Sequence, residues 1–537
     1  MKKTTRISSL WLVLALFINA ITASAQQAAK PNILFIAIDD LKPILGCYGN
    51  TMIRTPNIDR LARMGTIFKS NYCQQAVCGP TRASLMTGKR PDYTKIWDLK
   101  TRMRDKNPDI VSLPQYLITQ GYSTQGIGKV YDPRCVDKDL DKPSWSVPYH
   151  KTNKKYYGKY DEPIFGRYQL PETRALGEKY LKETAEKGMN KADANDYAQA
   201  KIKPTTENAD VPDYAYNDGA NVLQARDILA QLSKKSEPFF FAVGIAKPHL
   251  PFVAPKKYWD LYKREDMPTA EFQDATKNPV EPAYHNAGEI RAYTDIPPYI
   301  ASTTQKEIGL TLPIDKQKEL IHGYYAAVSY ADAQVGILLN TLDSLGLTKN
   351  TIIILWGDHG WHLGDHNLWC KHSNFEQATR TPMIIASPSV KPSQTSAQTE
   401  YVDIFPTLCE LSGVPIPTYL DGKSLVPLMR DAKAKVKEYS VSQYPRGGTG
   451  DGESGAQKAS TSIMGYSIRT ERYRYTVWMK NFRSNQPYKE DLLVGSELFD
   501  YKLDPNETVN FAKDKAYKKV SKEMHGKMLA FFKAQVK

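Results

Sequence analysis

Four short segments of the chain are apolar at nearly every position, with Gly244 and Thr351 as the exceptions. They are Ile33–Ile38, Phe239–Ile245, Thr351–Trp356 and Met383–Ala386. Continuous apolar runs of this length are typical of strands buried on both faces of a parallel sheet, because a solvated face would place a polar residue at every second position. We therefore expect these four runs to form the centre of a parallel sheet.

Segments with helical periodicity lie between these runs. Pro56–Met64 has proline at its first position and is followed by glycine, and Leu113–Gln120 also ends before a glycine. Asp218–Lys235 and Lys316–Leu345 carry apolar residues three to four positions apart. Strands that alternate with helices predict an α/β fold, with a mostly parallel sheet between two layers of helices.

Two regions depart from this alternation. Residues 149–213, Tyr149–Asp213, are rich in Lys, Tyr and Asp and only weakly periodic. They predict either an insertion that shapes a substrate site or a solvated loop. Tyr444–Ala456 is rich in glycine and predicts a flexible connection.

The C-terminal part has a different pattern. Ser467–Trp478 alternates as one strand, Glu497–Tyr501 continues as a second, and Ala512–Gln535 has helical periodicity. Together they predict a small α+β subdomain with an antiparallel sheet over residues 437–537.

The first 25 residues predict a secretory signal peptide. Lys2, Lys3 and Arg6 precede the apolar run Leu10–Ile21, and Ala23-Ser24-Ala25 has the A-x-A cleavage pattern. The run is too short to favour a membrane anchor. We therefore expect export to the periplasm or extracellular space, with residues 26–436 forming a catalytic domain.

Composition narrows the class of protein. The 537 residues are 41% hydrophobic, which excludes a disordered chain, and the mean hydropathy of −0.50 excludes a polytopic membrane protein. Six cysteines are too few for a disulfide scaffold.

Removing the three basic residues of the signal peptide lowers the net charge from +14 to +11, which favours an anionic partner. Export argues against nucleic acid and favours a sulfated glycan, and we expect no membrane association after cleavage.

Polar clusters follow two of the apolar runs. Asp39 and Asp40 end the first run, and Asp358 and His359 follow Thr351–Trp356 after one glycine. Sites in open α/β sheets form at the carboxyl ends of strands. One Asp-Asp pair alone would indicate a turn or helix cap. Two clusters at strand ends instead favour a hard divalent cation such as Ca²⁺ or Mg²⁺, which neutralises carboxylates that would otherwise repel.

The sharpest local motif is Cys78-Gly79-Pro80-Thr81-Arg82. Pro80 suits the first turn of a helix, which places Cys78 at a helix N-terminus where negative charge is stabilised. Arg82 lies one turn along on the same face. A lone cysteine is more often a core residue, but this setting predicts an activated nucleophile beside an anion site.

Cys-x-Pro-Thr-Arg resembles the maturation signature of the type I, formylglycine-dependent sulfatases, within the alkaline-phosphatase-like superfamily. The resemblance is closest to the iduronate-2-sulfatase group and implies an alkaline-phosphatase-like α/β fold and hydrolysis of sulfuric esters. Further segments resemble that group and occur in the same order along the chain. They are Asp39–Gly49, Gln74–Cys78, Gly128–Val130, Lys247–Phe252, Asp358–Phe375, Ser442–Arg446 and Ile463–Thr470.

This resemblance implies a modified nucleophile and a metal. In that family a maturation enzyme oxidises the cysteine to Cα-formylglycine (3-oxoalanine), whose hydrate is the nucleophile. By resemblance, Cys78 is modified in this way. Together with it, Asp39, Asp40, Asp358 and His359 bind one Ca²⁺.

The resemblance also implies roles for basic side chains. Arg82 holds the hydrate, Lys129 and Lys371 bind sulfate oxygens, and His249 protonates the leaving sugar oxygen. Trp361 is a candidate wall of the sugar subsite, or equally a core residue.

One position departs from the family pattern. The family places a histidine shortly after the counterpart of Lys129, where it takes a proton from the hydrate, and here Asp132 stands at that place. A carboxylate serves as a base only if its pKa is raised or the metal acidifies the hydrate. Asp132 is therefore either the base or a structural residue.

These observations predict hydrolysis of O-sulfate esters of an anionic polysaccharide, with a uronate 2-sulfate of a glycosaminoglycan as the first candidate. A sulfated algal galactan or ulvan is the next. A formylglycine-dependent hydrolase of phosphoesters or phosphonate esters, and a non-catalytic polyanion-binding protein, are the alternatives from other classes.

Overall fold

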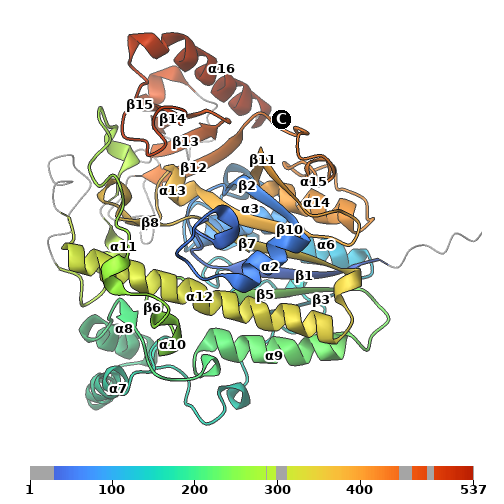
Figure 1. Ribbon diagram of the computed structural model, residues 1–537, viewed down its shortest axis with the longest axis vertical. Coiled ribbons are helices and arrows are strands. Elements are labelled where there is room, and N and C mark those ends of the chain that lie inside the picture. Colours follow the sequence, from blue (N-terminus) through green and yellow to red (C-terminus); the bar gives the residue numbers. More distant parts are fainter. Residues whose placement is uncertain (1–29, 286, 298–310, 447–462, 481–488, 536–537) are drawn as a thin grey trace, which may run out of the picture.

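The computed structural model describes residues 30–285, 287–297, 311–446, 463–480 and 489–535 (Figure 1). The predicted signal peptide and residues 447–456 of the glycine-rich connection lie outside the described residues. Within the described ranges, no helix combines the length and apolar character needed to cross a membrane.

A seven-stranded sheet forms the centre, in the order β11-β2-β10-β7-β1-β5-β3. The strands are β1 (Asn32–Ile38), β2 (Thr66–Tyr72), β3 (Ser123–Gly128), β5 (Phe239–Ile245), β7 (Thr351–Gly357), β10 (Arg380–Ala386) and β11 (Ser393–Glu400). β1 pairs in parallel with β5 and β7, with Ile36 opposite Val243 and Leu355. The fourth predicted run differs from expectation, because β10 is antiparallel to both of its neighbours.

Helices cover both faces of this sheet. Alternate residues of β1 point to opposite layers, because successive side chains of a strand alternate. Leu34, Ile36 and Ile38 pack with one set of helices, and Ile33 and Phe35 with the other. The first layer contains α2 (Pro56–Met64), α9 (Asn217–Leu232) and α12 (Ile314–Ser344), and the second contains α3 (Cys78–Thr87), α6 (Leu113–Thr119) and α14 (Ile404–Leu411).

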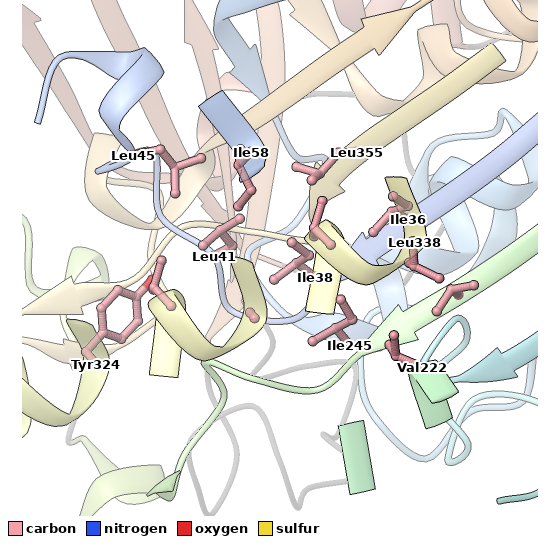
Figure 2. Close-up of a cluster of buried hydrophobic side chains, with 14 of the residues drawn as sticks. Ile36, Ile38, Leu41, Leu45, Ile58, Val222, Ile245, Tyr324, Leu338 and Leu355 are labelled. Atoms are coloured by element: carbon pink, nitrogen blue, oxygen red, sulfur yellow. The ribbon is translucent and has the colours of Figure 1, made fainter. Parts of the chain in front are cut away.

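The first layer is a continuous apolar core. Figure 2 shows Ile36 and Ile38 of β1 beside Ile245 of β5 and Leu338 of α12. All four side chains are fully buried, and burying one of this size contributes about 1.5–3 kcal/mol. The core therefore fixes β1, β5 and β7 relative to one another, and with them the residues that follow these strands.

Residues 149–213, which we call the insertion, are not merely a loop. They contain the helices α7 (Pro171–Glu186) and α8 (Lys191–Lys201), which pack against each other at one side of α12 (Figure 1). The remaining short elements are α4 (Pro91–Thr94), α5 (Met103–Lys106), α10 (Lys256–Trp259), α11 (Gly288–Arg291), α13 (Glu376–Thr379), α15 (Val426–Arg430), β4 (Thr206–Glu207), β6 (Phe252–Val253), β8 (His362–Leu363) and β9 (Trp369–Cys370).

A second, antiparallel sheet lies near the C-terminus. Its strands are β12 (Ser440–Arg446), β13 (Ile463–Arg469), β14 (Tyr473–Lys480) and β15 (Leu493–Asp500), and α16 (Lys518–Gln535) packs on it. The prediction of one strand over Ser467–Trp478 is wrong, because β13 and β14 form a hairpin there. The terminal helix begins at Lys518, six residues later than predicted. The predicted α+β character of this region is confirmed.

Candidate active site

Two carboxylate clusters meet at the carboxyl edge of the central sheet. Asp39 and Asp40 follow β1, and Asp358 and His359 follow β7, the strand beside it. The backbone N–H of Asp40 donates to Asp358 Oδ1 at 2.9 Å, and all four side chains are fully buried. The sequence prediction that these two strand ends lie together is confirmed.

Cys78 begins α3, as the Pro80 signature predicts, and its Sγ lies 3.5 Å from His359 Nε2 and 3.8 Å from Lys129 Nζ. Burial raises the pKa of the Cys78 thiol well above its usual value, and the Asp39 carboxylate raises it further. The Lys129 ammonium acts in the opposite direction but does not reverse the shift. Burial therefore works against a thiolate at this position.

Arg82 connects the two strand ends. Its Nε donates to Asp358 Oδ2 at 3.1 Å and its Nη2 to Asp39 Oδ1 at 2.8 Å. Its Nη1 donates to the backbone carbonyls of Lys129 and Val130. The guanidinium is fully buried, so these bonds replace the water that it has lost. Four of its five N–H groups are used, and both carboxylates are held in one orientation.

The arrangement of lone pairs fits a cation. His359 Nδ1 donates to the carbonyl of Gly360 at 3.0 Å, which leaves Nε2 as an acceptor facing Asp40 Oδ1 at 3.2 Å and Asp358 Oδ2 at 3.6 Å. Burial raises the pKa of Asp40 well above its usual value and that of Asp358 to about 6, with Asp39 adding to both shifts.

The possible ligand atoms of Asp40, Cys78, Asp358 and His359 all lie within 4.8 Å of one another, as do those of Asp39, Asp40, Cys78 and His249. Acceptors that face acceptors in a buried site repel unless a cation lies between them. Because carboxylate oxygens predominate, the donor set suits a hard divalent cation.

Two lysines flank this cluster. Lys129, which follows β3, forms an ion pair with Asp39. Lys371 donates to Asp40 at 3.1 Å and to Glu289 Oε1 at 2.9 Å, and it lies over the ring of Trp361. Both ammonium groups therefore lie against the carboxylate cluster, where they can bind an anionic group.

His249 lies on the loop after β5. Its Nδ1 donates to the carbonyl of Leu250 at 2.6 Å, so Nε2 faces Glu289 Oε1 at 3.5 Å and Asp40 Oδ2 at 3.8 Å. Burial lowers its pKa well below the usual value, and Lys371 and Lys129 lower it further. The resting imidazole is therefore neutral, and the negative charge of a bound substrate would raise its pKa.

A cavity of about 190 Å³ opens beside these groups. Its lining includes Asp39, Lys129, His249 and, from the insertion, Arg167. A larger cavity of about 970 Å³ is lined mainly by residues 138–152 and contains none of the clustered side chains. Of these two cavities, the smaller one therefore adjoins the carboxylate cluster.

For two residues the sequence left two roles open, and their surroundings favour the structural one. Asp132 is buried and forms two side-chain hydrogen bonds with Arg134. Although burial alone would raise it, the pKa of Asp132 is lowered by Arg134 and Lys129. Trp361 is only 1% exposed and belongs to the main apolar core, so its ring supports Lys371 rather than facing the cavity.

Two residues near the site carried no recognisable sequence signal. Glu289, on the single turn of α11, accepts from Lys371 and from His372 Nε2 at 2.9 Å each. Arg167 belongs to the weakly periodic insertion. Both are distant in sequence from every motif, and only tertiary structure brings them to the site.

Comparison with protein-family models identifies the chain. The sulfatase model matches residues 31–414, which include the central sheet and every strand end described above. The chain belongs to the sulfatase family. A second model, N-sulphoglucosamine sulphohydrolase, C-terminal, matches residues 364–534. As a sulfatase, the protein is a hydrolase of sulfuric esters.

Among its relatives, human (Homo sapiens) iduronate 2-sulfatase is 32% identical over 527 residues, covering 88% of this sulfatase and 90% of the relative. A solved complex with D-glucosamine-2-N,6-O-disulfate has a TM-score of 0.68 at 21% identity and covers 94% and 98% of the two chains. The phosphonate monoester hydrolase of Agrobacterium radiobacter has a TM-score of 0.65 at 23% identity and covers 94% and 96%. These two structures show the shared fold.

Proposed function

We propose that this sulfatase is exported and hydrolyses O-sulfate esters of an anionic glycan, with 2-O-sulfated uronate as the substrate unit. In this proposal Cys78 is converted to Cα-formylglycine and the carboxylate cluster binds one Ca²⁺. The observation that carries the proposal is the meeting of Cys78 with a cation-binding cluster and two lysines at one edge of the sheet. The proposal of export rests on the N-terminal sequence pattern.

The side chains around residue 78 have separate roles in binding and orientation. Lys129 and Lys371 bind sulfate oxygens, and Arg82 orients Asp39 and Asp358 while keeping one N–H for the hydrate. When bound, the cation would neutralise sulfate charge and acidify the hydrate hydroxyl.

In the first step a hydrate hydroxyl loses its proton to water and its oxygen bonds to sulfur, as the bond between sulfur and the sugar oxygen breaks. His249, protonated at Nε2 once the bound anion has raised its pKa, delivers that proton to the leaving oxygen. In the second step the other hydroxyl loses its proton to water and the bond between carbon and the sulfate oxygen breaks. Sulfate leaves, the aldehyde returns, and water hydrates it again.

The identity of the sugar is supported by the relative that acts, by its name, on iduronate 2-sulfate, and by the positive charge of the chain. A sulfated algal galactan or ulvan is the alternative glycan. A phosphonate or phosphate ester hydrolase is the alternative chemistry, because a phosphonate monoester hydrolase has the same fold.

Comparing kcat/KM for nitrophenyl sulfate, phosphate and phosphonate tests the reaction, and a panel of defined sulfated disaccharides tests the sugar. We expect preference for sulfate and for 2-O-sulfated uronate. A strong preference for the phosphorus esters would overturn the proposal.

His249→Ala should distinguish substrates by their leaving groups. Sugar alcohols are poor leaving groups and need a proton, whereas nitrophenolate leaves without one. General acid catalysis is typically worth about 10²–10⁴-fold, so we expect His249→Ala to lose about that in kcat on a sulfated disaccharide and much less on nitrophenyl sulfate. An equal loss on both substrates would show that His249 has another role.

Asp132→Asn provides the matched control. Asparagine keeps the acceptor for the Arg134 backbone N–H, which lies 3.0 Å from Asp132 Oδ1. The Arg134 side chain is 48% exposed and can be solvated by water instead. Because the Asp132 carboxylate has a lowered pKa, we expect it to be a poor base and the variant to keep turnover within a few-fold on both substrates. A uniform loss comparable to that of His249→Ala would restore Asp132 as the base.

A further inference from the structure

Arg167 lies at the tip of a fixed turn of the insertion. Ile164 and Tyr168 form a β-bridge, with the Ile164 N–H donating to the Tyr168 carbonyl at 3.0 Å. The side chain of Tyr168 is fully buried and donates to the carbonyl of Pro204 at 2.9 Å. On the other side, Asn217 Nδ2 of α9 donates to the Gly166 carbonyl at 3.0 Å. The turn is therefore anchored at its base by the Ile164–Tyr168 bridge and at its tip by Asn217, and the backbone of Arg167 has a defined position.

Arg167 lines the same cavity as Lys129 and His249. Two carboxylates also line it, but both have other partners. Asp39 is held by Arg82 and Lys129, and Asp218 accepts from the backbone N–H groups of Ala246 and Lys247 at 2.9 and 2.8 Å. Neither carboxylate is available to neutralise Arg167.

The Arg167 guanidinium has capacity to bind a ligand. Its side-chain hydrogen bond in the described part of the chain is a long one, 3.4 Å from Nη1 to Gln199 Oε1, and among the described residues it forms no ion pair with a carboxylate. The other two cations of the lining differ in this respect. Lys247 Nζ donates to the carbonyls of His249 and Pro251, and Lys129 forms an ion pair with Asp39. Arg167 is therefore the cation of this lining whose strong hydrogen-bonding capacity is unused.

We propose that Arg167 binds the carboxylate of the sulfated uronate and so selects an acidic sugar. The two lysines beside residue 78 serve the sulfate, so a second cation on the cavity wall suits a second anionic group on the same substrate. The planar fork of a guanidinium matches a carboxylate with two parallel hydrogen bonds. This inference rests on the proposed function and assigns the insertion a part in substrate recognition.

The test pairs two substrates with three variants. The substrates are a 2-O-sulfated uronate disaccharide and the same disaccharide with its carboxylate reduced to a hydroxymethyl group. Arg167→Gln removes the positive charge, and Arg167→Lys keeps the charge but lacks the planar guanidinium. Arg174→Gln removes a positive charge from the same insertion at a position outside the cavity lining. Nitrophenyl sulfate, which has no carboxylate, reports whether each variant is folded and active.

We expect Arg167→Gln to lose about 10- to 100-fold in kcat/KM on the uronate, the range for charge-assisted hydrogen bonds, and to equal the parent enzyme on the reduced sugar and on nitrophenyl sulfate. Arg167→Lys should fall between them, and Arg174→Gln should match the parent on all three. If Arg167→Gln loses equally on the uronate and the reduced sugar, the inference is wrong, and Arg167 serves the sulfate or the fold.

A binding measurement separates this inference from the proposed chemistry. In full-length Cys78→Ala protein, calorimetry should show the uronate disaccharide binding about 10- to 100-fold more tightly than its reduced form, with the difference lost on adding Arg167→Gln. Equal affinities for the two sugars would overturn the role of Arg167 even if sulfate hydrolysis is established. A clear difference in an enzyme that prefers phosphonates would support Arg167 while the proposed reaction fails.

Discussion

Cys78→Ala is expected to abolish turnover while leaving the fold intact. Removal of a catalytic nucleophile costs on the order of 10⁶-fold in kcat. Alanine deletes only the sulfur from a side chain whose contacts at 3.5–3.8 Å are weak, so the melting temperature should change little. Mass spectrometry of the corresponding peptide from active protein should show a lower mass than cysteine, because an aldehyde oxygen replaces the sulfur.

Cys409→Ala is the matched control, because Cys409 is also buried and free but lies in the apolar layer away from the cavity. It should keep full activity. Fully active protein that carries only unmodified cysteine at position 78 would refute the proposed formylglycine mechanism.

His359→Ala is expected to show the second-largest loss, about 10³-fold in kcat, because the several kcal/mol that a Lewis acid supplies depends on its being held in place. It tests the metal more cleanly than Asp39→Ala or Asp358→Ala. Both of those would also unpair the buried Arg82, and breaking a buried ion pair typically costs 3–5 kcal/mol. Elemental analysis should show less metal in His359→Ala, and chelation of the parent enzyme should mimic the variant.

His525→Ala, on α16 of the C-terminal subdomain, removes a histidine remote from the cluster and should keep both metal and activity. Ca²⁺ should restore chelated enzyme better than Zn²⁺, because carboxylate oxygens predominate among the ligands. Undiminished turnover in protein shown by elemental analysis to lack metal would refute the assignment.

Local sequence signals located the parts of the site that strand ends provide. The run before Asp39 and the run before Asp358 each predict a buried strand, and the parallel pairing of β1 and β7 joins them. Pro80 likewise places Cys78 at a helix start. These predictions succeed because each depends on one segment and one general rule about where parallel strands end.

Other features depend on contacts that no local pattern encodes. Glu289 meets Lys371 across 82 residues of sequence, and the turn of Arg167 is anchored by Asn217, 51 residues from Gly166. The error at Ser467–Trp478 has a different cause. The hairpin turns at Thr470–Arg472 without glycine, proline or asparagine, so the strand alternation continues through it without a break.

The burial of Cys78 sets an order of events in time. Its side chain is 1% exposed, and its sulfur lies beside Lys129 and His359, so the active site of another enzyme cannot reach it in the folded chain. If Cys78 is oxidised as proposed, the enzyme that oxidises it must therefore act on the chain before β1, β7 and α3 come together. In that case the interval for oxidation closes when the polypeptide folds, and copies that fold first would remain inactive.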